Sequence, residues 1–392
     1  MKWERKDFGP LPVRSWCVEL DSGTLEQVRH LASHPKVFHH IALMPDCHVG
    51  YGMPIGGVIA CDGAVIPNAV GVDIGCGMVA VQTDCPAESL TQAAVRHILD
   101  AVKLTVPMGE GRAHRTPQKW DGFERYGKPG WVDAHTWELA RCNLGTLGGG
   151  NHFLEIQSGS DGFVWLMIHS GSRNFGLKVA EHHHRIAQTL NLETSSADLA
   201  WLPVDSREGE TYIREMNFAL DYARENRARL MAALRKQVAS VLPRVNFVQE
   251  INIHHNYAAR ETHFGREVWV HRKGATSARA GETGIIPGSM GTVSYIVKGL
   301  GNAESFASCS HGAGRRMGRK QACRTLTKEE CDRAMRGIVF DGWQPARGHG
   351  MKGLFDLEEA PPAYKDIEEV ISAQLDLIEP LVKLRPLGVL KG

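Results

Sequence analysis

Residues 39–82 read HHIALMPDCHVGYGMPIGGVIACDGAVIPNAVGVDIGCGMVAVQ, and this stretch decides the expected fold class. Short apolar runs alternate here with glycine and proline, which is typical of buried strands joined by tight turns. The same texture returns at 151–157, at 162–170 and across 245–311. Glycine and histidine motifs therefore occur in both the first and the last third of the chain. Their interleaving favours one α/β domain over two independent domains.

Helical patterning fills the intervals between these strands. We expect helices near 88–104 and 132–142, a mainly helical excursion at 176–241 that is broken around 193–210, and a last helix at 365–384. Apolar residues recur at three- and four-residue spacing most clearly in TYIREMNFALDYARENRARLMAALRKQVASVL, residues 211–242. Since there is no repeat and no break in composition, residues 1–392 are predicted to form a single domain of α/β type with mixed α+β character.

Composition excludes several classes of protein. Of the 392 residues, 43% are apolar and 23% are charged, as in a globular protein and unlike a disordered one. The formal charge of +1 gives no global attraction to nucleic acid, so any polyanion must be bound by a local patch. No apolar run reaches the 18 residues of a membrane span, and the start MKWERKDFGPLPV is too charged for a signal peptide. Nine scattered cysteines without a CxxC pair indicate reduced thiols in the cytoplasm.

One group of residues has the composition of a metal site. Asp73 and Cys76 lie close together in GVDIGCGM, where glycines let the backbone approach an ion. Histidines also recur at the ends of apolar runs, at positions 152, 169, 254 and 255. Each feature alone is more typical of a buried structural residue. Together they suit one or two divalent transition metals, namely zinc, manganese, iron or cobalt.

A second group combines a histidine with cations. His311 lies in SCSHGAGRRMGRK and is followed by Arg315 and Arg319, whereas Arg316 and Lys320 are expected on a solvated helix face. Arginine binds phosphate with two parallel hydrogen bonds, and Arg173 stands next to a candidate ligand. The stretch HRKGATSARAGETGIIPGSMGT (271–292) adds amides and hydroxyls for a phosphate or a ribose. These residues predict a metal-dependent enzyme for phosphate esters, with a histidine that can be phosphorylated or nucleotidylated. The triplet His182–His184, by contrast, is expected on a solvated helix face.

These motifs resemble the RtcB family of GTP-dependent RNA-splicing ligases. The similar strings run nearly end to end and keep one order: ALMPDCH, PIGGVI, IPNAVGVDIGCGM, GTLGGGNHFLEI, MIHSGSR, INIHHNY, RKGATSARAG, IIPGSMGT, SCSHGAGR, AYKDI and the terminal LKG. The resemblance implies a single domain with mixed sheets around a central metal cleft. It also implies two Mn²⁺ ions bridged by a thiolate, with GTP as co-substrate. The matching ligands are Asp73, Cys76, His152, His169 and His255, which leaves His254 as a neighbour that does not ligate.

The resemblance also assigns the nucleotide site. The family nucleophile matches His311, which attacks the α-phosphate of GTP and forms a histidine–GMP phosphoramidate. Residues matched to the nucleotide are Asn151 and Asn256 at its phosphates, Glu155 and Lys391 at guanine, Phe153, Ser289 and Tyr364 around the guanosine, and Gly312 and Gly314 beside the nucleophile. Arg173, Arg315 and Arg319 would hold the phosphate at the RNA end or the flanking backbone.

The implied reaction joins an RNA 3′-phosphate, or a 2′,3′-cyclic phosphate after hydrolysis, to a 5′-hydroxyl end. GMP passes from the histidine to the 3′-phosphate, and the 5′-hydroxyl then expels it. Splicing of transfer RNA and repair of cut transfer or ribosomal RNA both fit, with or without an archease-type activator. Cys47, Asn174 and Phe175 depart from the family pattern and bear on end preference or redox sensitivity. Two alternatives stay open: a dinuclear phosphoesterase that needs no GTP, and a non-enzymatic RNA-binding or repair-accessory protein.

Overall fold

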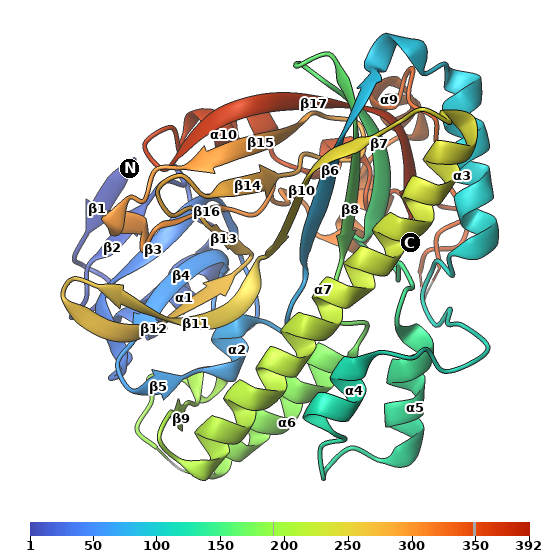
Figure 1. The fold of residues 1–392 in the computed structure, drawn as a ribbon. Coiled ribbons are helices and arrows are strands. Elements are labelled where there is room, and N and C mark those ends of the chain that lie inside the picture. Colours follow the sequence, from blue (N-terminus) through green and yellow to red (C-terminus); the bar gives the residue numbers. More distant parts are fainter. Residues whose placement is uncertain (191, 348–349) are drawn as a thin grey trace.

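A computed structural model describes residues 1–190, 192–347 and 350–392 of the chain (Figure 1). The helices within those ranges are α1 Ser22–Ala32, α2 Pro67–Val70, α3 Gln92–Thr105, α4 Asp121–Tyr126, α5 Ala134–Asn143, α6 Phe175–Thr189, α7 Arg207–Val241, α8 Arg319–Thr325, α9 Lys328–Ala334 and α10 Ile367–Ser372. None of these helices combines the length and the apolar character needed to cross a membrane.

The strands form two large sheets and two small ones. The six-stranded sheet has the order β1-β2-β3-β4-β12-β11, and the seven-stranded sheet has the order β10-β6-β8-β7-β17-β15-β14. Strands β13 and β16 pair with each other, as do β5 and β9. The bounds are β1 Trp3–Arg5, β2 Val13–Ser15, β3 Val37–His48, β4 Ile55–Cys61, β5 Ala64–Val65, β6 Gly77–Pro86, β7 Phe153–Gly159, β8 Phe163–Ser170, β9 Leu202–Pro203, β10 Phe247–His254, β11 Asn256–His263, β12 Arg266–Lys273, β13 Ala275–Ser277, β14 Thr283–Ile286, β15 Ser294–Gly299, β16 Ser308–Ser310 and β17 Ile378–Lys391.

The seven-stranded sheet is buried on both faces. Along β8, Val164, Leu166 and Ile168 join the core beneath helices α3 and α7, whereas Trp165 and Met167 join the core on the opposite face. Side chains of a strand point alternately to its two faces, so a strand covered on both sides reads as the unbroken apolar run seen in FVWLMIHS. Figure 1 shows α7 lying diagonally across β6, β8 and β10.

The helical excursion is predicted correctly. The structure breaks 176–241 into α6 and the 35-residue α7, which packs against α6 and α3. Aromatic side chains, among them Phe123, Phe175 and Phe218, join α4, α6 and α7 in one apolar cluster. The expected solvated face for the histidine triplet of α6 is wrong, because His183 and His184 are buried. His183 Nε2 lies 2.7 Å from Glu215 Oε2 on α7, so this ring nitrogen has a partner inside the helix pair.

The expected last helix at 365–384 is also wrong. Only the six residues of α10 are helical, and the chain then forms the long strand β17. Pro380 lacks an amide hydrogen and would break a helix at that point. Pairing with β7 on one side and β15 on the other supplies β17 with backbone partners instead, and the register shifts next to Pro380 and Pro386. The helices near 88–104 and 132–142 are confirmed as α3 and α5, and so is the mixed α/β fold class.

Candidate metal centre and nucleotide site

The register of the seven-stranded sheet brings the predicted metal ligands to one edge. Gly77, at the start of β6, pairs with Ser170 at the end of β8, and Phe153, at the start of β7, pairs with His169. On the other side of β6, Gly77 pairs with His254, the last residue of β10. Because neighbouring strands are antiparallel, each starts where the next one ends. Cys76, His152, His169 and His255 therefore meet at the same edge although they are far apart in sequence.

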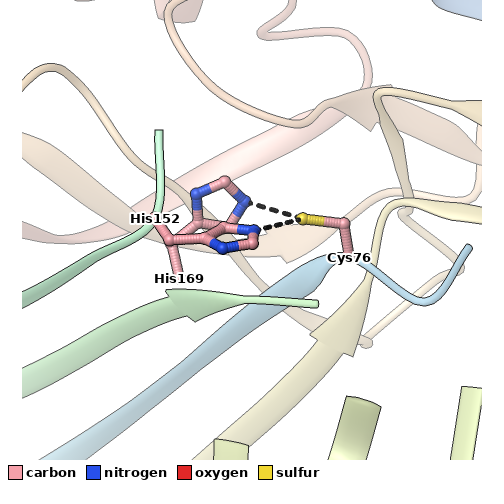
Figure 2. A group of neighbouring side chains, drawn as sticks. All are labelled: Cys76, His152 and His169. Atoms are coloured by element: carbon pink, nitrogen blue, oxygen red, sulfur yellow. Dashed lines mark hydrogen bonds between the residues drawn. The ribbon is translucent and has the colours of Figure 1, made fainter. Parts of the chain in front are cut away.

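The side chains at this edge converge on the Cys76 sulfur. Cys76 Sγ lies 3.2 Å from His169 Nε2 and 3.5 Å from His152 Nε2, and dashed lines mark both contacts in Figure 2. The cluster extends on both sides, because His255 Nε2 lies 3.4 Å from His169 Nε2 and Asp73 Oδ2 lies 3.4 Å from His152 Nε2. The structure thus brings together all five side chains predicted as ligands.

His254, predicted not to ligate, points elsewhere. Its Nδ1 lies 3.1 Å from the Gly75 carbonyl and 3.1 Å from a guanidinium nitrogen of Arg227. Arg227 is completely buried on α7 and also donates to the carbonyl oxygens of Gly75 and Ser170. It therefore ties the loop before Cys76 to the strand end that carries His169. Arg227 was not predicted from the sequence, since an arginine inside an amphipathic helix gives no local signal.

One glycine near the cluster is required by a close approach. A Cβ on Gly171 would lie 2.5 Å from Asp73 Oδ2, well inside van der Waals contact. Any larger residue at position 171 would push the Asp73 carboxylate out of the cluster. The glycine in the motif MIHSGSR is therefore explained by packing against a candidate ligand.

The donor set fits a transition-metal ion. Burial lowers the pKa of His169 and His255 well below the usual range, so both imidazoles are neutral and can offer a lone pair. His169 Nδ1 donates to the Asn151 carbonyl at 3.0 Å, which leaves Nε2 free to face Cys76. Within the described part of the chain, the buried His255 Nδ1 has no partner. A thiol, three imidazoles and a carboxylate form a set suited to zinc, manganese, iron or cobalt.

The pKa values of Asp73 and Cys76 depend on burial and on the charged groups around them. Burial favours the neutral form of Asp73, but His152 and Arg173 outweigh it and lower its pKa to about 2. Burial, reinforced by the Asp73 charge, raises the pKa of the Cys76 thiol well above its usual value. A thiol must lose its proton to bind a metal, so binding here would release a proton.

His311 lies beside this cluster, and a buried carboxylate orients it. Its ring centroid is 5.0 Å from that of His255. Its Nδ1 lies 2.6 Å from Oδ2 of Asp46 on β3, and the same oxygen accepts the His311 amide at 3.2 Å. A Cβ on Gly314, which has a φ of +74°, would lie 2.5 Å from the Asp46 carbonyl, so only glycine lets this loop approach β3. Asp46 was missed as a functional residue, although it lies within the quoted string ALMPDCH.

Three of the residues predicted around the guanosine, Phe153, Glu155 and Lys391, lie on the paired strands β7 and β17. Phe153 pairs in register with Lys391, and Glu155 pairs with Val389. The Lys391 ammonium lies 5.6 Å from the centre of the Phe153 ring. Burial raises the pKa of Glu155 to about 8, although the nearby Lys391 charge acts against this shift. Lys391 is thus held in a sheet, not at a frayed chain end.

Glu359 is the centre of a charged network that the sequence analysis missed. Its carboxylate lies 3.6 Å from Lys391 Nζ and 3.1 Å from a guanidinium nitrogen of Arg315, and it accepts the Tyr364 hydroxyl. Arg319 lies 3.5 Å from the same carboxylate with about half of its side chain exposed. Arg315 also donates to the carbonyls of Glu358 and Met317, so its guanidinium is largely occupied by the protein itself.

The remaining predicted residues lie in different surroundings. Asn256 links two loops of the site, because its side chain donates to the Asp73 carbonyl and accepts the Gly274 amide. Ser289 is buried and bonds Thr292, Gly312 is buried beside His311, and Asn151 is exposed next to His152. Of the three residues that depart from the family pattern, Cys47 and Phe175 are buried and Asn174 has a positive φ at the start of α6.

Comparison with known proteins identifies the family. The family model described as "tRNA-splicing ligase RtcB" matches residues 27–127 and 121–392. The chain belongs to the RtcB family. The "RNA-splicing ligase RtcB" of Escherichia coli (strain K12) is 39% identical over 419 aligned positions, which cover all of both chains. The "tRNA-splicing ligase RtcB" of Pyrobaculum aerophilum is 32% identical over 94% of this chain and 91% of its own.

A third RtcB relative, the "tRNA-splicing ligase RtcB" of Thermococcus kodakarensis, is 32% identical over 94% of this chain and 91% of its own. The residues matched by the RtcB family model include the whole Cys/His cluster, Asp46 and His311. The resemblance stated from the motifs is therefore confirmed at the level of the family.

Proposed function

We propose that this protein is an RNA ligase that joins a 3′-phosphate or 2′,3′-cyclic phosphate end to a 5′-hydroxyl end, using GTP and Mn²⁺. The observation that carries the proposal is the position of His311, whose ring lies 5.0 Å from that of His255 in the Cys/His cluster. A histidine next to a metal-ion cluster is suited to nucleotidyl transfer, because the charge on the reacting phosphate is neutralised there. The curated relatives named above are RNA- or tRNA-splicing ligases.

His311 acts as the nucleophile in this mechanism. The Asp46 carboxylate lies 2.6 Å from Nδ1 of the ring, so it favours the tautomer with the proton on Nδ1, in which the lone pair of Nε2 is free. Nε2 forms a bond to the α-phosphorus of GTP while the bond to pyrophosphate breaks. The 3′-phosphate of RNA then takes GMP from the histidine, and the 5′-hydroxyl attacks the activated end and expels GMP.

The metal ligands in this mechanism are Asp73, Cys76, His152, His169 and His255. When bound, two Mn²⁺ ions would neutralise phosphate charge and favour the deprotonated attacking oxygen. The protein's own part is to hold the ligands rigidly: Arg227 fixes the Cys76 loop, and the Asn151 carbonyl fixes the His169 ring. The proposal also includes a cytoplasmic location and allows an archease-type activator.

The experiment that tests this function uses two RNA strands, one with a 3′-phosphate and one with a 5′-hydroxyl. Incubation with GTP and Mn²⁺ should give a joined product, and omission of GTP should abolish it. A dinuclear phosphoesterase would remove the phosphate without GTP and join nothing. A protein that only binds RNA would leave both strands unchanged. Either of these two results would contradict ligation.

Replacing Asp46 by asparagine should slow the formation of the histidine–GMP adduct by about 10²–10⁴-fold. The amide can donate to Nδ1, which would move the ring proton to Nε2 and block the attacking lone pair. Rapid-quench labelling with GTP measures the rate, and metal content serves as the control for an intact cluster. A D46N variant that labels at the wild-type rate would show that Asp46 only supports the fold.

The affinity for GTP should rise with pH up to about 8. Guanine presents two N–H donors; an ionised carboxylate can accept a hydrogen bond from both, whereas a protonated carboxyl can accept from only one of them. Since the pKa of Glu155 is raised to about 8 in the free protein, binding at pH 7 must first remove its proton. The dissociation constant should therefore fall by up to about tenfold per unit from pH 6 to pH 8 and then level off. E155Q should flatten this dependence, and an equally steep profile in E155Q would exclude Glu155 as its cause.

A further inference from the structure

A cationic hollow lies beside the loop that leads to the metal cluster. It has a volume of about 530 Å³, within the usual range of ligand sites, and its lining includes Lys103, Leu104, Pro107, Arg112 and Arg115. These residues belong to the end of α3 and to the loop that joins it to α4. Figure 1 shows that loop at the right-hand edge of the molecule. None of the site residues described above lines this hollow.

Of the three cations that line the hollow, two have no side-chain partner among the residues that the structure describes. Lys103 is paired with Asp100 and Asp341, at 2.7 and 2.8 Å. By contrast, Arg112 and Arg115 are exposed and form no ion pair or side-chain hydrogen bond with any described residue of the chain. The neighbouring Glu110 is exposed and is not within ion-pair distance of either arginine. Unpaired guanidinium groups around a hollow indicate an anionic ligand, because they present donors that nothing in the protein uses.

Backbone hydrogen bonds join one wall of the hollow to the segment 147–148, which packs against Arg173. Leu147 donates to the Pro107 carbonyl at 3.0 Å, and Gly109 donates to the Gly148 carbonyl at 2.9 Å. Gly148, with a φ of +90°, lies against the Arg173 guanidinium, and Arg173 lies 3.1 Å from His152 Nδ1. Arg173 therefore stands between the hollow and the cluster. A chain of phosphates passing through the hollow would continue over Arg173 to the metal ligands.

We propose that Arg112 and Arg115 bind the phosphodiester backbone of an RNA strand whose reactive end lies at the Cys/His cluster. The proposal rests on the RNA ligation proposed above. It also accounts for how a chain with a net charge of +1 holds a polyanion: the positive charge is concentrated on the approach to the site. Leu104, 88% exposed on the rim, offers an apolar surface for a base of the same strand.

The test compares the double variant R112Q/R115Q with the wild type in two assays. In the first, fluorescence anisotropy without GTP measures the binding of one RNA that ends in a 3′-phosphate and of another that begins with a 5′-hydroxyl. We expect about tenfold weaker binding of at least one RNA. The RNA association constant should also depend less steeply on salt. The slope of its logarithm against the logarithm of the salt concentration should become shallower by about 1.4, since each phosphate contact to a single strand contributes about 0.7. The RNA that loses affinity identifies the strand in the hollow.

The second assay is labelling of the protein by GTP in the absence of RNA, which should be unchanged in R112Q/R115Q. The matched control is R260Q/R266Q, which removes the same charge from the β11–β12 hairpin, on the opposite side of the molecule in Figure 1. Wild-type RNA affinity and salt slope in R112Q/R115Q, or an equal loss in the control, would overturn the proposal. A wild type that binds RNA but is not labelled by GTP would contradict the ligase mechanism and leave the binding comparison valid.

Discussion

His311→Ala is expected to abolish labelling of the protein by radioactive GTP. In the proposed mechanism the imidazole Nε2 is the atom that bonds to phosphorus, and alanine offers no substitute. The wild-type adduct should be labile in acid and stable in base, as a phosphoramidate is. Electrophoresis after acid and alkaline treatment measures both properties. Joining of RNA should disappear together with the label.

The matched control for this prediction is His135→Ala, which removes an exposed histidine at the start of α5 and should label normally. The metal content of the His311→Ala variant should stay at the wild-type level, because His311 is not among the five clustered side chains. Label that persists in His311→Ala would assign the nucleophile to another residue. A wild type that never labels, but hydrolyses cyclic phosphate, would support the phosphoesterase alternative.

Cys76→Ser should remove bound metal and lower RNA joining by more than about 100-fold. The Cys76 sulfur lies at the centre of the cluster, within 3.5 Å of two imidazole nitrogens. A serine hydroxyl is nearly isosteric, but it ionises far less readily than a thiol and is a poor ligand for a transition metal. Elemental analysis after dialysis measures the bound metal.

Thermal unfolding provides a second readout for Cys76→Ser. A ligand that binds only the folded protein stabilises it by about 2.7 kcal/mol when present at 100 times its dissociation constant. Added Mn²⁺ should therefore raise the Tm of the wild type and of the control Cys142→Ser, but not the Tm of Cys76→Ser. An equal rise in all three proteins would place the metal site elsewhere.

The sequence predicted the strands better than it predicted the end of the chain. An unbroken apolar run such as FVWLMIHS predicts a strand without knowledge of its neighbours, because a strand buried on both faces requires apolar residues at every position. The segment 365–384 has helix-like spacing, yet only Ile367–Ser372 is helical and the segment ends in strand β17. That outcome depends on β7 and β15, because β17 lies between them in the sheet and pairs with both. Local periodicity contains no information about such a position.

The electrostatic partners of the site were predicted least well. Asp46 lies 265 positions before His311 in the sequence, and Glu359 combines with Lys391, Arg315 and Tyr364 from separate segments. Single carboxylates in a chain with 44 acidic residues give no local signal of this kind. Arg112 and Arg115 likewise become notable only in the folded chain, where no described residue pairs with them.

The sequence by itself determined the fold class, the family and the kinds of side chain available at the site, because these depend on residue type and on the order of motifs. Only the tertiary structure decided which side chains meet. His254 and His255 are adjacent in sequence, yet one contacts Arg227 and the other His169. The physical reason is the antiparallel register of β10, β6, β8 and β7, which gathers distant strand ends at one edge and sets the direction of each side chain there.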